Sequence, residues 1–351
     1  MKSSNFLLYG ANGYTGNLCA REAARRGLRP ILAGRDRDKV ERLAAELGLE
    51  SRVFSLEDST ALEAALNEVA AVLHCAGPFS RTSKPMATGC LRTGTHYLDI
   101  TGEVTVFESL AARDAEAKKA GVMLLPGVGF DVVPSDCLAA HLKRRLPSAT
   151  QLALGIQGLG RISHGTATTM VENINRGGLV RRDGRLTPVP TAWKTRVIDF
   201  GRGPAKAVTI PWGDVSTAFY STGIPNIEVY AAVPASARRM MVASRYTGWL
   251  LGSPVIQNFL KRRIDAQPPG PNETERARGR SFVWGEAMDD AGQRKVSRLS
   301  GPEGYTLTMM TALKTVERLL AGQFTAGFQT PSLAYGADFI MEIEGVSRED
   351  L

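Results

Sequence analysis

The sequence contains few of the residues from which metal and hydrolytic sites are usually built. Only four of its 351 residues are histidine and four are cysteine, and none of them has a metal-ligand spacing such as Cys-x-x-Cys or His-Glu-x-x-His. The chain also lacks a Gly-x-Ser-x-Gly nucleophile motif. None of the eight tyrosines is followed four positions later by the lysine of a Tyr-x-x-x-Lys proton-transfer pair. We therefore expect no metal centre, no serine hydrolysis and no chemistry that depends on that pair.

Long runs of one residue class are also missing. The net charge is +8, but Lys and Arg are scattered, so we expect no nucleic-acid partner and interpret the charge as an attraction for an anionic cofactor and substrate. The longest apolar stretch, Met240–Ile264, is interrupted by Arg245, Pro254 and two amides, which disfavours a membrane-spanning helix. Peripheral membrane contact through this stretch is one alternative, and a buried or dimer-interface helix pair is the one we favour.

The N-terminal residues and the cysteines indicate the compartment. The first strand begins within a few residues of Met1, which leaves no room for a signal peptide. The cysteines lie in apolar or helical surroundings and are expected to be reduced core thiols: Cys19, Cys75, Cys90 and Cys137. We therefore expect a cytoplasmic protein.

A glycine-rich motif follows the first apolar run, Phe6–Tyr9, and precedes an amphipathic run that begins at Asn17. A strand, a tight glycine turn and a helix start together form an anion site, because backbone N–H groups and the helix dipole face the ligand and glycine lets the backbone approach a pyrophosphate. We therefore predict that the motif binds a dinucleotide through Gly10, Ala11, Asn12, Gly13, Tyr14, Thr15 and Gly16.

The second apolar run, Pro30–Ala33, ends where an NAD-binding protein carries an acid that accepts hydrogen bonds from the ribose 2′-hydroxyl. Gly34 and Arg35 occupy that place, and Asp36 comes one position late. Since a guanidinium suits a 2′-phosphate, we predict NADP(H) as the cofactor, with Gly34 and Arg35 in its site. The alternative interpretation is a solvated basic turn.

Apolar runs alternate with helical patterns six times over residues 1 to 130, which predicts an N-terminal doubly wound Rossmann domain of the α/β class with a parallel sheet. In such a sheet the ligand lies beyond the carboxyl ends of the strands. The run Ala71–Cys75 therefore adds Ala76, Gly77 and Pro78 to the predicted cofactor site. One long helix is expected over Glu103–Ala120.

The pattern changes after Pro126, where strand-like stretches and hairpin signals at Asp183-Gly184 and Asp290-Ala291-Gly292 predict a second, α+β domain containing a mixed or antiparallel sheet. We expect residues 1–131 to bind NADP and residues 132–324 to bind the substrate and to form a homodimer. The C-terminal segment 325–351 is expected to pack back on the first domain.

Several motifs recur in one order along nearly the whole chain, and in that order they resemble the saccharopine dehydrogenase-like oxidoreductases, including the trans-acting enoyl reductases. The resemblance implies an NADP-binding Rossmann domain and a second domain that closes over the nicotinamide, and it leaves the substrate open. It rests on Gly10–Gly16, Ala76–Pro78, Tyr97–Glu103, Gly129–Asp136, Gly165-Thr166, Arg182–Gly184, Pro211–Val215, Ser221–Asn226, Gly285–Ala287, Gly304–Thr308 and Thr330-Pro331.

Two residues are candidates for a catalytic role. Asp131 follows the last predicted strand of the first domain, where it can position substrate or relay a proton, and its alternative role is a hinge or helix-cap hydrogen bond. His164 precedes a predicted helix start, where a substrate carboxylate or carbonyl can bind, and a plain surface histidine is its alternative.

The function that we expect is NADPH-dependent hydride transfer to a carbon–carbon double bond of a small-molecule, lipid-like or polyketide-like substrate. Saccharopine-type imine reduction would need convergent cations, and the loops Trp212–Ser216 and Ser221–Asn226 contain none. Arg161, Arg176 and Arg182 keep imine reduction open as carboxylate clamps. A non-catalytic NADP-sensing protein is the third alternative.

Overall fold

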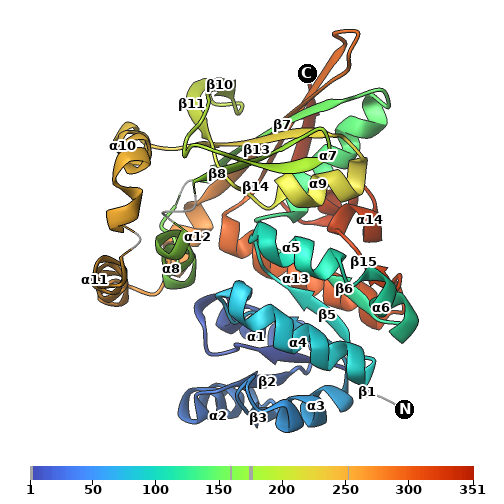
Figure 1. The fold of residues 1–351 in the computed structure, drawn as a ribbon. Helices are drawn as coiled ribbons and strands as arrows, with labels where there is room; N and C mark the ends of the chain where they lie inside the picture. Colours follow the sequence, from blue (N-terminus) through green and yellow to red (C-terminus); the bar gives the residue numbers. More distant parts are fainter. Residues whose placement is uncertain (1–2, 159, 174–176, 252) are drawn as a thin grey trace. The chain divides into compact units, whose positions relative to one another are not determined.

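The computed structural model describes residues 3–158, 160–173, 177–251 and 253–351 (Figure 1). The chain folds into two compact units, the first formed by residues 1–131 and 305–334 and the second by residues 132–304 and 335–351. The N-terminal segment of the first unit ends at residue 131, where the first domain was predicted to end. The C-terminal part differs from the expectation, because residues 305–334 join the first unit and residues 335–351 the second.

The first unit is built on a seven-stranded sheet in the order β15-β6-β5-β4-β1-β2-β3, in which every pair is parallel. The order reverses between β1 and β4, as in a dinucleotide-binding fold. This confirms the predicted doubly wound α/β domain. Its strands are β1 (Ser3–Tyr9), β2 (Ile31–Gly34), β3 (Ser51–Val53), β4 (Val69–His74), β5 (His96–Asp99), β6 (Met123–Leu125) and β15 (Gly327–Phe328).

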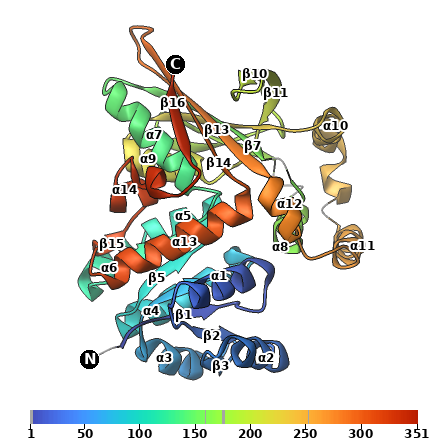
Figure 2. The same ribbon diagram turned by 180° about the vertical axis from the view of Figure 1, so that it is seen from behind.

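Helices cover both faces of this sheet, with α3, α4 and α5 on one face and α1 and α13 on the other (Figures 1 and 2). Phe6, Leu7 and Leu8 of β1 are fully buried, as expected for a central strand that is covered on both sides. The helices of the unit are α1 (Tyr14–Arg25), α2 (Arg37–Leu47), α3 (Ser59–Asn67), α4 (Phe79–Thr93), α5 (Val104–Ala111), α6 (Asp114–Ala120) and α13 (Gly304–Leu320).

The expected helix over Glu103–Ala120 is interrupted and forms α5 and α6. Helix α6 starts at Asp114, whose carboxylate accepts a hydrogen bond from the backbone N–H of Phe328 at 2.9 Å. Phe328 belongs to β15, which pairs with β6. The break between the two helices therefore coincides with a contact between residues more than 200 positions apart in the sequence. Local helical periodicity does not predict such a contact.

Two hydroxyl groups fasten α13 to the end of the parallel sheet. Thr308 accepts a hydrogen bond from the backbone N–H of Phe130 at 3.0 Å, and Thr311 donates to the carbonyl of Val128 at 2.8 Å. A Cβ atom on Gly129 would come within 2.8 Å of Thr308, so this packing needs glycine. These contacts explain why residues 305–334 belong to the first unit, although they follow the second domain in the sequence.

The second unit contains a mixed sheet in the order β10-β11-β12-β7-β13-β14-β16, with β8 paired to β12 and β9 to β8. Among the described strands of this second sheet, only the pair of β12 with β7 is parallel, which confirms the predicted mixed sheet. The strands are β7 (Gln151–Gly158), β8 (Gly178–Arg182), β9 (Arg185–Val189), β10 (Thr195–Asp199), β11 (Pro204–Thr209), β12 (Asn226–Ala232), β13 (Arg280–Met288), β14 (Arg294–Pro302) and β16 (Ser347–Asp350).

Both predicted hairpins are present. Asp183 and Gly184 adopt positive φ angles of 46° and 74° between β8 and β9, as a two-residue hairpin turn requires. The helices of the unit are α7 (Val133–Arg145), α8 (His164–Asn173), α9 (Asp214–Thr222), α10 (Ala235–Leu251), α11 (Pro254–Asp265) and α12 (Glu273–Arg278). Short helices at Pro331–Tyr335 (α14) and Phe339–Glu342 (η1) precede β16.

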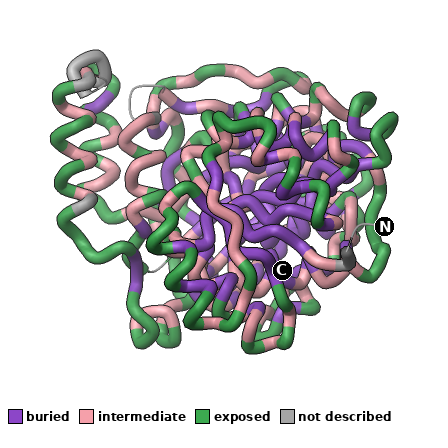
Figure 3. Tube along the Cα trace, turned by 90° about the horizontal axis from the view of Figure 1, so that it is seen from below, coloured by how far each residue is buried: buried purple, intermediate pink, exposed green. Residues whose placement is uncertain are grey.

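Buried residues are concentrated along the strands and the inner helix faces (Figure 3). All four cysteines are free thiols, and Cys19, Cys90 and Cys137 are buried, as predicted. Helices α10 and α11 instead carry exposed apolar side chains, discussed below. Within the described part of the chain, no helix combines the length and the apolar character needed to cross a bilayer.

Candidate dinucleotide site

The glycine motif forms a tight turn at the carboxyl end of β1. The N–H of Gly10 donates to the carbonyl of Ala33 at 2.8 Å, and the N–H of Gly13 donates to the carbonyl of Gly10 at 3.0 Å. Gly10 has a φ of +83°, which L side chains rarely adopt. A Cβ atom on Gly16 would clash with the carbonyl of Gly10, so two of the three motif glycines are required by the turn itself.

The loops after β1 and β4 meet where the strand order reverses. A Cβ atom on Gly10 would lie 2.8 Å from the backbone nitrogen of Ala76 and 2.9 Å from its Cβ. The structure therefore brings together two segments that the sequence identified separately, Gly10–Gly16 and Ala76–Pro78. Such a crevice at the switch point is where open α/β sheets bind their ligands.

Carboxylates occupy two of the three helix starts around this crevice. Glu103 accepts hydrogen bonds from the backbone N–H groups of Phe79 at 2.8 Å and Ser80 at 3.1 Å, which caps α4. Asp36 caps α2 by accepting from the N–H of Lys39 at 3.2 Å. Helix α1 begins after Gly13 with no side-chain cap from that residue. Among these three helices, α1 is therefore the one whose positive end suits the pyrophosphate.

Arg35 lies exposed directly after β2 and has no hydrogen bond or ion pair with another described residue. Asp36, the acid that comes one position late, is engaged by both the backbone and the ammonium group of Lys39, the latter at 2.9 Å. A Cβ atom on Gly34 would come within 2.9 Å of Asn12 Oδ1, so Gly34 borders the glycine loop. This arrangement leaves a guanidinium, and no uncommitted acid at that strand end, for the ribose substituent.

The residues present therefore fit NADP(H). A side chain on Gly10 or Gly16 would fill the glycine cradle, the α1 start would receive a pyrophosphate, and Arg35 would receive a 2′-phosphate. All the predicted cofactor-binding segments belong to the first unit and follow β1, β2 and β4, which are neighbours in the sheet.

Three supporting residues escaped the sequence reasoning. His74, at the end of β4, is fully buried, and burial lowers its pKa to about 3, so the ring is neutral. Its Nε2 lies 3.0 Å from Thr82 Oγ1, and that hydroxyl donates to the carbonyl of Ala76 at 2.7 Å. The third is the side chain of Glu103: the residue starts its own helix α5, as expected, and its carboxylate caps α4. A polar residue that ends an apolar strand was the available signal for His74, whereas the partners depend on tertiary contacts.

Asp131 ends the first unit. Burial raises the pKa of its carboxyl to about 6, and the group forms no hydrogen bond or ion pair with another described residue. A Cβ atom on Gly102 would lie 2.8 Å from Asp131 Oδ2, so glycine at that position makes room for the carboxylate. Asp99 provides the contrast, because Asp131 is half-buried, whereas Asp99 is fully buried and accepts hydrogen bonds from Tyr97, Thr101 and Gly127.

His164 lies in the second unit, as the first residue of α8. Its Nε2 is 2.8 Å from the carbonyl of Gln267, and its own N–H donates to the carbonyl of Pro269 at 3.1 Å. This carbonyl contact gives His164 a positioning role for the loop 267–269. A role toward substrate stays a prediction.

The remaining motifs of the second unit form internal contacts. Asp214 and Ser216, in the stretch expected to line a substrate pocket, are fully buried, and Asp214 accepts a hydrogen bond from Ser135 of α7 at 2.8 Å. Arg182 lies over the ring of Trp193 at 4.3 Å, and Arg161 pairs with Glu275 at 2.9 Å. Arg176 lies outside the described residues.

Comparison with known proteins assigns the first unit. Residues 6–125 match the family described as the saccharopine dehydrogenase NADP binding domain. The trans-acting enoyl reductase of Mycobacterium leprae is 33% identical over 150 residues, which cover 40% of this chain and 36% of that protein. A saccharopine dehydrogenase-like oxidoreductase of Bos taurus is 29% identical over 217 residues, covering 56% of this chain and 46% of its own.

The chain thus spans about a third of the length of the enoyl reductase that it matches. Apo saccharopine dehydrogenase (L-Glu forming) from Saccharomyces cerevisiae has the same fold, with a TM-score of 0.69 over 99% of this chain and 100% of that one at 11% identity. The match over residues 6–125 confirms NADP(H) as the predicted cofactor. Residues 6–125 therefore form an NADP-binding domain of the saccharopine dehydrogenase type.

Proposed function

We propose that this protein is an NADPH-dependent reductase that transfers hydride to a carbon–carbon double bond of a lipid-like or polyketide-like substrate in the cytoplasm. The observation that carries the proposal is the uncapped start of α1 beside the uncommitted Arg35, in a domain of the NADP-binding family. The similarity to trans-acting enoyl reductases supports a double bond as the reacting group.

Reduction of a double bond requires a hydride and a proton. NADPH supplies the hydride when it is bound. The carboxyl of Asp131 is suited to hold the proton, because a pKa of about 6 keeps a fraction of the group protonated near neutral pH. Its lack of a hydrogen-bond partner among the described residues leaves the carboxyl available to a substrate. We propose that Asp131 holds this proton and that His164 contacts the substrate.

The main alternative is saccharopine-type imine reduction, which needs several cations around substrate carboxylates. Of the clamps considered for that reaction, Arg161 is paired with Glu275 and Arg182 is stacked on Trp193. Because both arginines already interact with other side chains, they are poorly placed to bind substrate carboxylates, which favours the enoyl substrate. A protein that binds NADP without turnover is the other alternative.

Steady-state NADPH oxidation distinguishes the three functions. We expect turnover with long-chain enoyl thioesters and little with lysine plus an aldehyde acid. The reverse order would establish imine reduction. NADPH binding without turnover of any member of an enoyl and imine panel would contradict a reductase and indicate the sensing role. The matched control is the Asp131→Asn variant, which should retain NADPH affinity and lose turnover if Asp131 holds the proton.

A further inference from the structure

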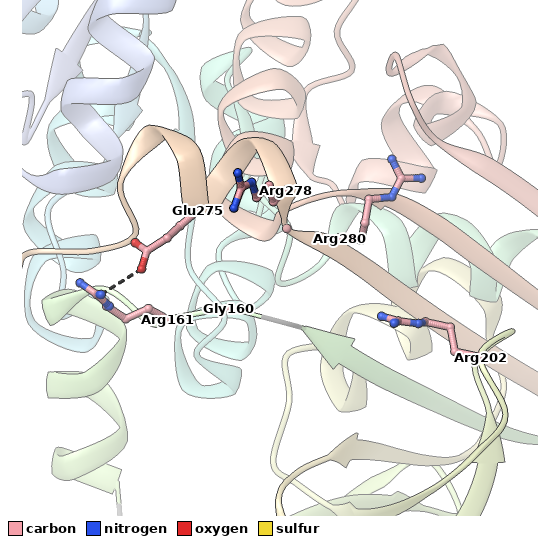
Figure 4. A pocket seen from close by; sticks show the side chains of 7 residues that line it. Gly160, Arg161, Arg202, Glu275, Arg278 and Arg280 are labelled. Carbon is pink, nitrogen blue, oxygen red and sulfur yellow. Dashed lines mark hydrogen bonds and ion pairs between the residues drawn. The ribbon is translucent and has the colours of Figure 1, made fainter.

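A cavity of about 380 Å³ in the second unit is lined by four arginines and a single acidic residue (Figure 4). The cations come from three segments, because a single residue separates Arg278 from Arg280. Arg161 follows β7, Arg202 lies in the turn between β10 and β11, Arg278 ends α12 and Arg280 begins β13. Neither the motifs of the sequence nor the dinucleotide site accounts for this cluster.

The sheet brings these segments together. Strands β7 and β13 are antiparallel neighbours with Gly158 opposite Ser281, so Arg161 and Arg280 flank the same end of this pair. The β10–β11 hairpin packs on the sheet through Ile198 and Phe200, which share a buried cluster with Trp284. Strand alternation places Arg280 and Phe282 on one face.

The aromatic ring of Phe282 holds one of the cations in place. The guanidinium of Arg202 lies 5.5 Å from the centre of that ring, within the range of a cation–π contact. The hairpin therefore carries Arg202 to the face of the sheet on which Arg280 begins β13.

The acidic residue is already committed. Glu275 Oε1 pairs with Arg161 at 2.9 Å, and Glu275 Oε2 accepts the N–H of Asn272 at 2.7 Å as part of a capping box. Figure 4 shows the Arg161–Glu275 pair on the α12 side of the cavity. The guanidinium groups of Arg202, Arg278 and Arg280 form no hydrogen bond or ion pair with another described residue.

The side chains of Arg202, Arg278 and Arg280 are exposed, and the cavity lining carries a formal charge of +3, which attracts an anion. In Figure 4 the guanidinium groups lie around the cavity and apart from one another, so they suit an anion that carries several phosphate charges. A single carboxylate is planar, carries one charge and is satisfied by one guanidinium fork.

We propose that this cavity binds a phosphate-bearing anion. The proposal is independent of whether a carbon–carbon or an imine bond is reduced. Two sources share the chemistry, inorganic pyrophosphate and an organic phosphate such as that of coenzyme A.

The test is calorimetric titration of the full chain with pyrophosphate and, separately, with coenzyme A, at saturating NADPH so that the glycine loop is filled. In the Arg202→Gln/Arg278→Gln variant we expect at least roughly tenfold weaker binding, because two positive charges are removed from the cavity. The control variant, Arg185→Gln/Arg239→Gln, loses the same charge at exposed positions outside the cavity and should bind as the wild type does.

Each outcome decides the matter. If the wild type binds pyrophosphate but not coenzyme A, the ligand is inorganic. If the wild type binds both and the cavity variant loses both, the ligand is the phosphate group of a larger molecule. Equal weakening in the two double variants, or no binding of either ligand to the wild type, would overturn the site. Glutarate binding as tight as pyrophosphate would overturn the phosphate class. Unchanged NADPH affinity in the cavity variant verifies that the protein is folded.

Discussion

Gly10 and Ala76 meet backbone to backbone, because a Cβ atom on Gly10 would lie 2.8 Å from the nitrogen of Ala76. The two residues are 66 positions apart and end neighbouring strands at the point where the strand order reverses. The floor of the dinucleotide crevice is therefore a contact that only glycine permits.

Gly10→Ala should impair both folding and cofactor binding. The positive φ costs about 1 kcal/mol and the clash with Ala76 about 1–3 kcal/mol more in the free energy of unfolding. We expect NADPH affinity to fall at least roughly tenfold, because the loop must move away from the pyrophosphate. Urea unfolding and fluorescence titration measure the two effects.

Gly27→Ala is the matched control for that change. Gly27 also has a positive φ, +77°, but a Cβ atom there would meet no atom within 4 Å. It should lose only about 1 kcal/mol of stability and bind NADPH normally. If both variants bound NADPH equally well, the close contact with Ala76 would have no bearing on the cofactor.

Arg35→Ala should change the choice of cofactor. Loss of a guanidinium–phosphate contact worth about 1.5–3 kcal/mol weakens NADPH roughly 10- to 150-fold and leaves NADH nearly unchanged. Binding of both nucleotides is measured by fluorescence titration. The control is Arg37→Ala, because Arg37 is paired with Glu41 at 2.7 Å. Equal weakening of NADPH and NADH by Arg35→Ala would contradict the role assigned to this residue.

Asp131→Asn should stabilise the protein above pH 6. Burial raises the carboxyl pKa to about 6, from its ordinary value of 3.8, so the folded state binds more protons than the unfolded state between these values. This group therefore lowers wild-type stability as the pH rises from 4 to 6, and the cost persists above pH 6. The variant removes a cost of about 1–3 kcal/mol, which urea unfolding at pH 4 and pH 8 measures.

Asp338→Asn is the control of opposite sign. Arg144 and Arg348 hold the pKa of Asp338 well below its usual range, so this carboxylate contributes stability above the unfolded-state pKa and loses it as the pH falls. The variant should be less stable at pH 8. The free energy of unfolding of the wild type, minus that of Asp131→Asn, should change between pH 4 and pH 8. If this difference stayed constant, the carboxyl of Asp131 would titrate normally.

We propose a homodimer that forms through α10 and α11. The side chains of Met240, Tyr246, Val255 and Phe259 are 64%, 79%, 78% and 56% exposed, more apolar surface than a single subunit usually presents on two helices. Tyr246→Glu/Phe259→Glu should give the monomer mass by light scattering, whereas the wild type gives twice that mass. The side chains of Trp249, Leu250 and Leu251 lie outside the described part.

Val197→Glu is the control for the assembly test, because Val197 is 60% exposed on β10, away from the two helices in the sequence. It should remain dimeric. A monomeric wild type that sediments with anionic vesicles would instead support peripheral membrane contact through the basic residues Lys261, Arg262 and Arg263.

Short-range patterns in the sequence determined the cofactor domain. The glycine turn, the strand that precedes it and the position of Arg35 are local features, because a turn, a helix start and a strand end each depend on a few adjacent residues. The family match over residues 6–125 confirms NADP(H), and the parallel sheet confirms the doubly wound fold. The hairpin at Asp183-Gly184 was predictable for the same reason, since its positive φ angles are required by the turn itself.

Contacts between distant segments were decided by the tertiary structure. Asp114 ends the expected long helix by binding Phe328, Glu103 caps a helix that begins 24 residues before it, and α13 joins the first unit through Thr308 and Thr311. The four arginines of the cavity lie in segments that only the pairing of β7 with β13 and the folding of the β10–β11 hairpin bring together. Such contacts depend on which segments of the whole chain pack against one another, and local periodicity in the sequence does not predict this packing.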